Sequence, residues 1–294
     1  MLKNYQTAIV TGASHGIGPF IVRALAKEGM NIVLAARSGN ELEQVATSAD
    51  IRAAGVQVLT VPTDVTQRDA RSALVSAAER TFGSVDVLVN NAGGDLQREF
   101  HRYTVGEVEA LIALNLIGPI ELTRLLLPGM LQRGRGHIVN ISSLGGSVGF
   151  PYTEVYSAAK DGLIAFTRVL RADYRKQGVS SSVLILGPIG GAGTGARTME
   201  ELNLAMSAMA KASMSPPEAV AQAVLKSIKR DKAELVVMPG PGRLIRTLMT
   251  FFPGMGPAMN EMTGSTQTMK QVADLREQQR AQAIAGVNSP VQQR

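Results

Sequence analysis

The stretch "TAIVTGASHGIG", residues 7–18, decides the fold. It begins with five residues typical of a buried strand, and Gly12, Gly16 and Gly18 then lead directly into a helical pattern. Glycines between a strand and a helix permit a tight turn and let backbone N–H groups approach a pyrophosphate at the helix N-terminus. The stretch therefore predicts a dinucleotide-binding turn after the first strand. A turn that serves only strand and helix packing is the alternative.

The same alternation of apolar runs and longer helical patterns continues to about residue 237. Strands are expected at residues 7–11, 31–36, 56–61, 86–90, 137–142, 181–186 and 234–238. Helices are expected at residues 17–29, 40–54, 67–82, 104–133, 153–177 and 216–230. This pattern is typical of βαβ units and a parallel sheet. It predicts an α/β fold: a single doubly wound Rossmann-type domain, residues 1–238, with a seven-stranded parallel sheet.

Two segments depart from the alternation. Residues 187–215 are rich in glycine and then in methionine, and their length predicts a substrate loop or lid. Residues 239–294 are interpreted as a C-terminal extension, with an apolar element to about 264, a polar helix to about 284 and a disordered tail. The apolar element is expected to be a packing element or subunit contact. A membrane-surface anchor is the alternative.

Composition excludes several classes of site. The 294 residues include no cysteine, and the three histidines, His15, His101 and His137, lack metal-ligand spacing. We therefore expect no disulfide, no thiol nucleophile and no metal. The N-terminus lacks the features of a signal peptide, and no apolar run reaches the roughly 18 to 20 residues that span a bilayer. These observations predict a cytoplasmic protein.

The chain is basic, with a formal net charge of +6 and a pI near 9.7. The positive charges are dispersed, and no aromatic residues are interleaved with them for base stacking. We expect a solvated basic face and no nucleic acid, with an anionic substrate or carrier as the alternative. The densest basic group consists of Lys226, Lys229, Arg230 and Lys232, followed by Arg243 and Arg246.

The end of the second predicted strand indicates which dinucleotide binds. An acidic residue there accepts hydrogen bonds from the adenosine ribose and repels a 2′-phosphate. This chain has Ala36 at that position and Arg37 after it. A guanidinium pairs well with phosphate, so the sequence predicts NADP(H) as the cofactor. His15 could add a donor to the same phosphate; simple exposure to solvent is the alternative.

Three further motifs follow the glycine turn in a fixed order: "NNAG" at residues 90–93, Ser142 with Ser143, and "YSAAK" at residues 156–160. With these motifs the chain resembles the short-chain dehydrogenase/reductase family over roughly residues 5–238. The resemblance implies a Rossmann-type domain, NAD(P)(H) as hydride carrier and no metal in the chemistry. It also implies a homodimer or homotetramer assembled through the helices at 104–133 and 153–177.

The resemblance places a catalytic tetrad at Asn115, Ser143, Tyr156 and Lys160. Ser143 is preferred to Ser142 because it lies thirteen residues before Tyr156. Reduction of a carbonyl needs a proton for the developing alkoxide, and a free tyrosine, with a pKa of about 10, releases its proton reluctantly. A lysine four residues later lies on the same helix face, where its ammonium, with the oxidised nicotinamide, favours the phenolate.

The other two members of the tetrad have supporting roles. Ser143 is expected to donate a hydrogen bond to the substrate oxygen. Asn115 is expected to hold a water that relays protons to Lys160; an amide in a helix interior without such a role is the alternative.

The resemblance also implies the cofactor contacts. Asp64, after the third strand, is expected to bind adenine together with Val65, although it could instead be a helix N-cap. At the end of the sixth strand the chain has Leu186 where the family usually has proline, and extra glycines precede Thr194. The full predicted cofactor set is Gly12, Ser14, His15, Gly16, Ile17, Gly18, Arg37, Asp64, Val65, Asn91, Ala92, Gly93, Tyr156, Lys160, Gly187, Ile189 and Thr194.

The leading interpretation is an NADPH-dependent oxidoreductase that interconverts a ketone or aldehyde and an alcohol. Its substrate walls are expected at residues 94–103, 144–153 and 187–215, and Tyr152 is expected to be a wall or packing residue. Methionine in the last wall suggests an adaptable pocket for an apolar, aromatic or acyl substrate; the residues are Met199, Met206, Met209 and Met214. The rivals are a lipid ketoreductase on a membrane or acyl carrier, and a dinucleotide-sensing scaffold that has lost its chemistry.

Overall fold

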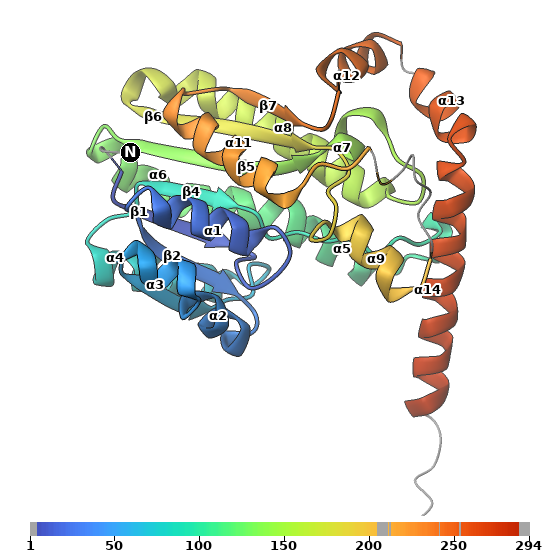
Figure 1. Cartoon of the computed structure of the whole chain (residues 1–294), viewed down its shortest axis with the longest axis horizontal. Helices are drawn as coiled ribbons and strands as arrows, with labels where there is room; N and C mark the ends of the chain where they lie inside the picture. The colour runs from blue at the N-terminus through green and yellow to red at the C-terminus, as the bar shows by residue number, and fades with distance from the viewer. Residues whose placement is uncertain (1–4, 205–210, 212, 241, 253, 288–294) are drawn as a thin grey trace, which may run out of the picture.

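The computed structural model describes residues 5–204, 211, 213–240, 242–252 and 254–287. Seven parallel strands form one sheet in the order β3-β2-β1-β4-β5-β6-β7 (Figure 1). The predicted fold class is confirmed, and every predicted strand is present with ends that differ by at most two residues. The strands are β1 (Thr7–Thr11), β2 (Asn31–Ala36), β3 (Val58–Pro62), β4 (Val87–Asn90), β5 (Gly136–Ser143), β6 (Val179–Leu186) and β7 (Glu234–Val237).

Helices cover both faces of the sheet, and successive residues of β1 belong to the two opposite cores. Ala8 and Val10 pack in the core under α1, α2, α3 and α11, whereas Ile9 packs in the core under α4, α6 and α8. Strands buried on both faces read as continuous apolar runs, which is why they were predictable. The helices named here are α1 (Gly18–Lys27), α2 (Gly39–Ala46), α3 (Ala49–Ala54), α4 (Arg68–Phe82), α6 (Gly118–Gln132), α8 (Glu154–Tyr174) and α11 (Pro217–Lys229).

The helix predicted at 104–133 is interrupted. It consists of α5 (Val105–Ile112), a π turn at Ala113–Ile117 and α6. The whole run Val105–Gln132 is long and apolar enough to cross a membrane by length and composition, so the expectation that no such run exists was wrong. In this fold α6 packs against β5 and β6, and the core helix of a globular protein passes the same test, so this finding is weak support for a membrane span.

Two other predicted segments also differ from the structure. The helix expected at 40–54 divides into α2 and α3, because Thr47 bonds back to the Glu43 carbonyl and Ser48 adopts an extended conformation. Such competition of hydroxyl side chains with the helix is typical of Ser and Thr. The segment at 187–215 is not all loop, because it contains α9 (Thr194–Glu201).

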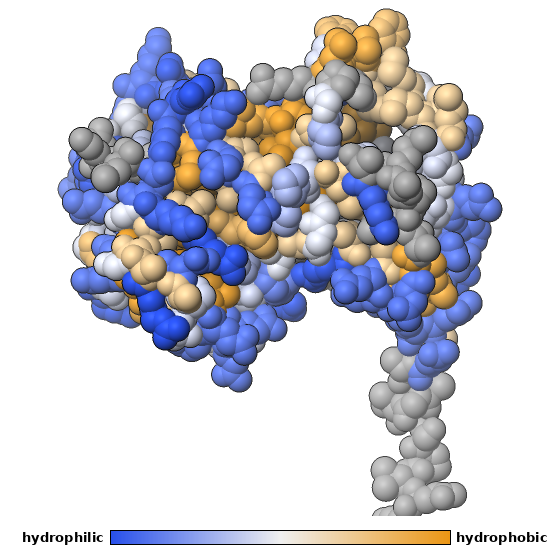
Figure 2. Space-filling view, in the orientation of Figure 1, coloured by the Kyte–Doolittle hydropathy of each residue, from blue (hydrophilic) through white to orange (hydrophobic). Residues whose placement is uncertain are grey.

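After β7 the chain forms α12 (Gly242–Phe251), α13 (Met255–Met262) and α14 (Ser265–Val287). The predicted polar helix is α14, which extends three residues beyond its expected end; residues 288–294 of the predicted tail lie outside the described residues. Large apolar side chains on α12 and α13 are exposed, and Figure 2 shows an apolar crest over α12. The exposed large apolar residues here are Leu244, Leu248 and Phe251 of α12, Phe252 after it and Met262 at the end of α13.

Helix α14 runs along one side of the molecule next to α5 and α9 (Figure 1). Arg98, only 9% exposed, fixes it there. The Arg98 Nη1 donates to Glu107 Oε2 at 2.8 Å, and its Nε donates to Glu277 Oε2 on α14 at 3.0 Å. Arg280 also pairs with Glu107, and Arg276 pairs with Glu201 of α9 at 2.7 Å. The C-terminal helix is therefore attached to two of the predicted substrate walls.

Replacing Arg98 by methionine should lower the free energy of unfolding by about 3 kcal/mol, because it leaves the Glu107 and Glu277 carboxylates without their shared partner. Urea denaturation measures this loss, and limited proteolysis should cut at α14 sooner. Arg276→Gln is the control, since it removes a more exposed ion pair and should cost less than about 1 kcal/mol. Equal losses in the two variants would show that Arg98 is not the anchor.

Candidate active site

The glycine turn lies where the strand order reverses, because β1 pairs with both β2 and β4. This switch point is the usual ligand crevice of a doubly wound sheet. Gly12 has a φ of +63°, and a Cβ on it would come within 2.9 Å of the Ala92 Cα. A Cβ on Gly18 would lie 2.0 Å from the Gly12 carbonyl oxygen. Only glycine fits at these two positions, so the turn is fixed by close backbone approach.

The predicted residues Asn91 and Ala92 join the end of β4 to this turn. The Asn91 Nδ2 donates to the carbonyl oxygens of Thr11 and Gly12, each at 3.0 Å. The backbone N–H groups of Asn91 and Ala92 both donate to Thr11 Oγ1, also at 3.0 Å. This network holds the first backbone segment of the turn against the sheet.

The four predicted catalytic side chains come together beside the turn. Ser143 ends β5, Tyr156 and Lys160 lie on α8, and Asn115 lies in the π turn. The Lys160 Nζ is 5.7 Å from the centroid of the Tyr156 ring and donates to the Ile141 carbonyl at 3.0 Å. A Cβ on the predicted residue Gly93 would lie 2.9 Å from Asn115 Oδ1 and 3.1 Å from Lys160 Nζ. Asn115 and Lys160 therefore face the same small space.

The amide of Asn115 is fully buried and is bonded to backbone. Its Nδ2 donates to the carbonyls of Gly94 at 2.8 Å and Leu111 at 3.0 Å, and its Oδ1 accepts from the Gly94 N–H at 3.2 Å. The π turn presents this side chain to the loop after β4, and such bulges frequently occur at functional sites. Asn115 thus fixes the first predicted substrate wall; a water relay through it remains a prediction.

The protein's own groups shift the pKa values of Tyr156 and Lys160 in opposite directions. Burial raises the pKa of Tyr156 to about 12, the charge of Asp95 acts in the same direction, and the Ser143 hydroxyl opposes both. Burial also lowers the pKa of Lys160 to about 8, and this side chain is only 4% exposed. Burial disfavours the charged form of each group. By themselves, the side chains therefore hold the proton on the phenol rather than releasing it.

Asp95 is a functional candidate that sequence reasoning missed. It directly follows Gly94, which is bonded to Asn115, and its charge acts on both Tyr156 and Tyr103. Burial raises the pKa of Asp95 from 3.8 to about 6, and the charge of Glu154 adds to this rise, although backbone N–H groups oppose it. A partly buried carboxyl with a raised pKa, beside a catalytic candidate, often belongs to a site. Its position next to "NNAG" was the only available signal.

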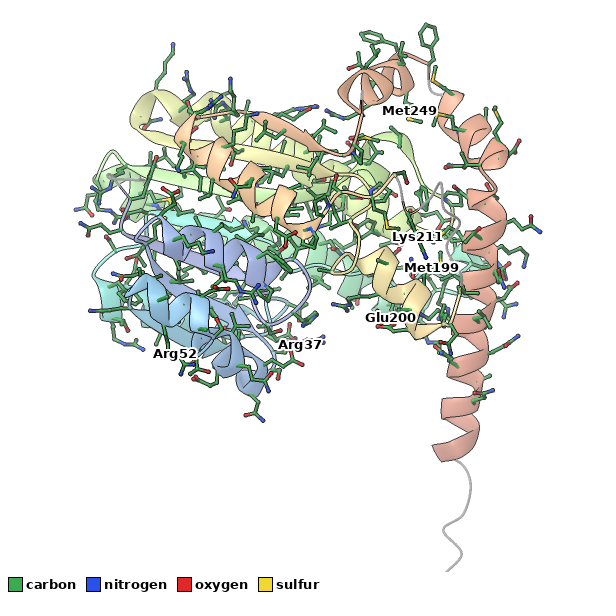
Figure 3. The ribbon with its side chains drawn as sticks, in the orientation of Figure 1. Arg37, Arg52, Met199, Glu200, Lys211 and Met249 are labelled. Atoms are coloured by element: carbon green, nitrogen blue, oxygen red, sulfur yellow. The ribbon has the colours of Figure 1, made fainter. Side chains whose placement is uncertain are left out.

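The residues predicted to bind the adenosine end lie at the edge formed by β2 and β3. Arg37 is exposed just beyond β2 (Figure 3), and it makes no ion pair within the described chain. Asp64 accepts from the N–H and hydroxyl of Thr66, at 2.9 and 2.7 Å. The alternative that Asp64 caps a helix was wrong, because Gln67 is the N-cap of α4. Val65 is buried beside it.

His15 and Ser14 stand at the tip of the glycine turn. The Ser14 hydroxyl lies 2.9 Å from His15 Nδ1, and the same nitrogen lies 3.4 Å from Glu41 Oε2. The His15 side chain is exposed, as the solvent alternative expected, while Ile17 packs against the core as the N-cap of α1. Whether His15 also contacts a phosphate stays a prediction.

The predicted nicotinamide contacts lie at the end of β6. The Gly187 N–H donates to the Val237 carbonyl, and Ile189 is buried and forms a bridge with Ser215. Thr194 is the first residue of α9, and its side chain is outside the described part of the chain. The bridge closes the base of the 187–215 segment.

The predicted substrate walls contain strained backbone. Gln97 and Tyr152 are two of the four non-glycine residues with positive φ in the described ranges, with φ of +53° and +60°. Such strain costs energy and gathers at functional sites. Met199 and Met214 are partly buried, whereas Met206 and Met209 lie outside the described residues.

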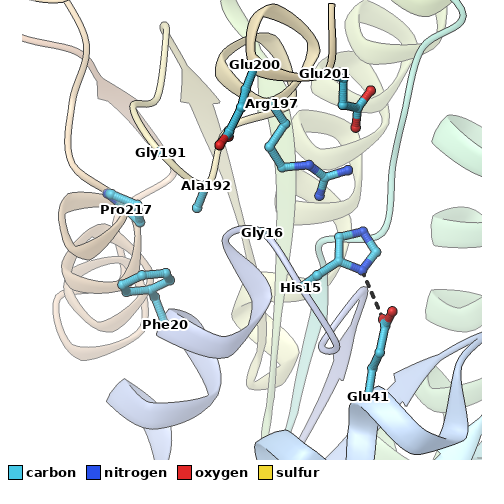
Figure 4. Close-up of a pocket in the computed structure, with 10 residues that line it drawn as sticks. All are labelled: His15, Gly16, Phe20, Glu41, Gly191, Ala192, Arg197, Glu200, Glu201 and Pro217. Carbon is cyan, nitrogen blue, oxygen red and sulfur yellow. Dashed lines mark ion pairs between the residues drawn. The ribbon is translucent and has the colours of Figure 1, made fainter. Parts of the chain in front are cut away.

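An open cleft of about 830 Å³ lies between the glycine turn and α9 (Figure 4). At this cleft, Arg197 of α9 lies near Gly16. No sequence pattern indicated this proximity, because the two residues are far apart in the chain. Its lining residues are His15, Gly16, Phe20, Glu41, Gly191, Ala192, Arg197, Glu200, Glu201 and Pro217.

Comparison with known proteins agrees with this architecture. The family model for short chain dehydrogenase matches residues 6–202, and the chain belongs to this family of oxidoreductases. It is 40% identical over 236 residues to the ketoacyl reductase HetN of Nostoc sp. (strain PCC 7120), covering 80% of this chain and 79% of that protein.

Two solved structures share the fold. A metagenomic short-chain oxidoreductase in complex with NADP has 32% identity and a TM-score of 0.66, and the match covers 80% of this chain and 97% of that one. A variant of actinorhodin polyketide ketoreductase with NADPH has 30% identity and a TM-score of 0.72, with 80% and 96% coverage. The predicted family resemblance is confirmed.

Asp95→Asn should stabilise the protein at pH 7.5 but much less at pH 4. The folded carboxyl, with its raised pKa, ionises later than the unfolded one, so stability is lost as the pH rises from about 4 to 6 and stays lost above. Asparagine removes this penalty. We expect a gain in Tm on the order of 2 °C or more at pH 7.5.

Differential scanning calorimetry at the two pH values measures the effect. Asp173→Asn, at an exposed position on α8, is the control and should change Tm equally at both. A gain for Asp95→Asn that is the same at pH 4 and pH 7.5 would contradict the burial of this carboxylate.

Proposed function

We propose that the protein is an NADP(H)-dependent oxidoreductase that interconverts a ketone or aldehyde and an alcohol, with Tyr156 as the general acid and base. The observation that carries this proposal is the meeting of Ser143, Tyr156, Lys160 and Asn115 beside the glycine turn. The similar proteins include ketoreductases and structures with NADP or NADPH. Because the chain belongs to this family of oxidoreductases, we favour this function over a dinucleotide-sensing scaffold that has lost its chemistry.

The residues present fit a bound dinucleotide phosphate. The glycine turn leaves the space that a Cβ would fill, and the guanidinium of Arg37 is free of ion pairs among the described residues. The turn would hold the pyrophosphate, Arg37 the 2′-phosphate, Asp64 with Val65 the adenine, and Lys160 the nicotinamide ribose. When bound, NADP(H) supplies or accepts the hydride.

Side chains of the protein itself would donate the proton to the substrate and then replace it. Ser143 would donate a hydrogen bond to the substrate oxygen as negative charge develops on it. The Tyr156 phenol, with its pKa near 12, carries its proton at neutral pH and would deliver it to that oxygen. Lys160, with its pKa near 8, is mostly charged at neutral pH, so it can stabilise the phenolate that remains and pass a proton back to it.

An apolar, aromatic or acyl substrate suits the walls of this site. Met199 and Met214 of the 187–215 segment are partly buried, and methionine adapts to varied apolar shapes. The name of the similar ketoacyl reductase favours the acyl member of this group. We place the reaction in the cytoplasm.

We also infer a homodimer or homotetramer. Val105, Ile117 and Val169 are exposed large apolar residues on the helices expected to pair. A contact between copies of the chain would cover them.

Tyr156→Phe should reduce turnover by at least about a hundredfold, because it removes the proton that the alkoxide takes up. The dissociation constant for NADPH should hardly change. A panel of ketones and alcohols, followed at the NADPH absorbance band, identifies a substrate and then compares the variants. Tyr174→Phe, at the far end of the same helix, is the matched control and should retain activity; an active Tyr156→Phe enzyme would show that another group is the acid.

Arg37→Ala should raise the KM for NADPH at least about tenfold and leave that for NADH nearly unchanged, because the guanidinium meets only the 2′-phosphate. Steady-state kinetics with the two cofactors measures this. Arg52→Ala, at an exposed position on α3 (Figure 3), is the control. Equal effects on both cofactors would contradict the phosphate pairing.

A further inference from the structure

Arg197 lies over the phosphate-binding turn although it belongs to the substrate loop. Its Nη1 is 3.5 Å from the position that a Cβ on Gly16 would occupy, and the Ala192 carbonyl oxygen is 3.1 Å from the same position. Figure 4 shows the guanidinium pointing from α9 toward the turn and His15. Ala192 and Arg197, two described residues of the 187–215 segment, therefore lie against the turn.

This guanidinium is available to a ligand. The side chain is partly buried, and it makes no hydrogen bond or ion pair with any residue that the structure describes. Three carboxylates line the same cleft. Glu201 pairs with Arg276 of α14 and Glu41 with His15, and among the described residues Glu200 makes no ion pair with Arg197. A partly buried cation without a protein partner, next to a phosphate-binding turn, calls for an anion.

We propose that Arg197 binds the pyrophosphate of the dinucleotide from the side opposite the glycine turn. The inference rests on the proposed function, because it takes NADP(H) as the ligand. The backbone N–H groups of the turn would bind one side of the pyrophosphate, and the planar guanidinium would bind the other with two parallel hydrogen bonds.

The position of Arg197 distinguishes the pyrophosphate from the 2′-phosphate. Gly16 belongs to the turn before α1, whose N-terminus attracts the pyrophosphate, whereas Arg37 lies beyond β2 at the ribose end. Arg197 would therefore bind a group that NADPH and NADH share. It sets affinity for both and does not discriminate between them.

The contact also links the cofactor to the substrate wall. The bridge between Ile189 and Ser215 fixes the base of the segment that contains α9. The ion pair of Glu201 with Arg276 fixes the C-terminal end of α9 itself. A phosphate bound to Arg197 adds a third attachment. Binding of the dinucleotide would thereby stabilise the wall that contacts the substrate, which favours cofactor binding before substrate binding.

Two nucleotide fragments test the proposal by isothermal titration calorimetry. ADP has a pyrophosphate without a 2′-phosphate or nicotinamide, and 2′-AMP has a 2′-phosphate without a pyrophosphate. Arg197→Gln should raise the Kd of ADP, NADH and NADPH by about tenfold each and leave that of 2′-AMP unchanged. Arg197→Lys, which keeps the charge but not the fork, should have a smaller effect.

Two matched variants complete the test. Arg37→Ala should weaken 2′-AMP and not ADP, which is the opposite result. Arg276→Gln loosens α9 without removing the guanidinium, so it should change the Kd of ADP less than Arg197→Gln does. Circular dichroism confirms that each variant is folded.

The inference is overturned if Arg197→Gln leaves the Kd of ADP unchanged, weakens 2′-AMP instead, or has no more effect on ADP than Arg276→Gln. In each of these cases the unaltered protein still binds NADPH, and the proposed function stands. If the unaltered protein binds none of NADPH, NADH and ADP, the proposed function fails, and this inference fails with it.

Discussion

The side-chain amide of Asn91 makes the contact on which the site depends. By donating to the carbonyls of Thr11 and Gly12, it ties the end of β4 to the end of β1 where the strand order reverses. Parallel strands open a crevice at such a point, but only a fixed loop gives the crevice a defined shape. The same tie sets the path of Gly93, whose missing side chain leaves room for Asn115 and Lys160. One short segment thus positions both the glycine turn and the predicted catalytic groups.

The sequence was sufficient to predict the elements that depend on a local pattern of residues. The strands of the sheet are apolar on both faces, and the glycine turn and "YSAAK" carry their chemistry within a few residues, so order and spacing sufficed. The two interruptions of predicted helices were harder to predict from the sequence. The π turn at Asn115 replaces part of a helix whose periodicity continues through it, and the break at Thr47 arises from one hydroxyl bonding to its own backbone.

What the sequence could not predict is contact between distant segments. In the sequence, Arg98 looks like an ordinary surface charge, but in the structure α14 places Glu277 against it. Arg197 likewise looks like part of a loop, but α9 places it near Gly16. Asp95 was passed over because its burial comes from the surrounding fold rather than from its neighbours in sequence. In each case the functional meaning of a charged group depends on what removes it from water.

The pKa values bear on how the catalytic pair works. The expectation that a lysine four residues away favours the phenolate assumed that the ammonium acts on an otherwise ordinary phenol. Here burial is the largest influence on the pKa of the phenol and raises it, and burial also lowers the pKa of the ammonium. A pair arranged in this way keeps its protons until a further positive charge enters the same space. Under the proposed function, the oxidised nicotinamide would supply that charge, so proton release by Tyr156 would depend on it, and Lys160 would return the proton afterwards.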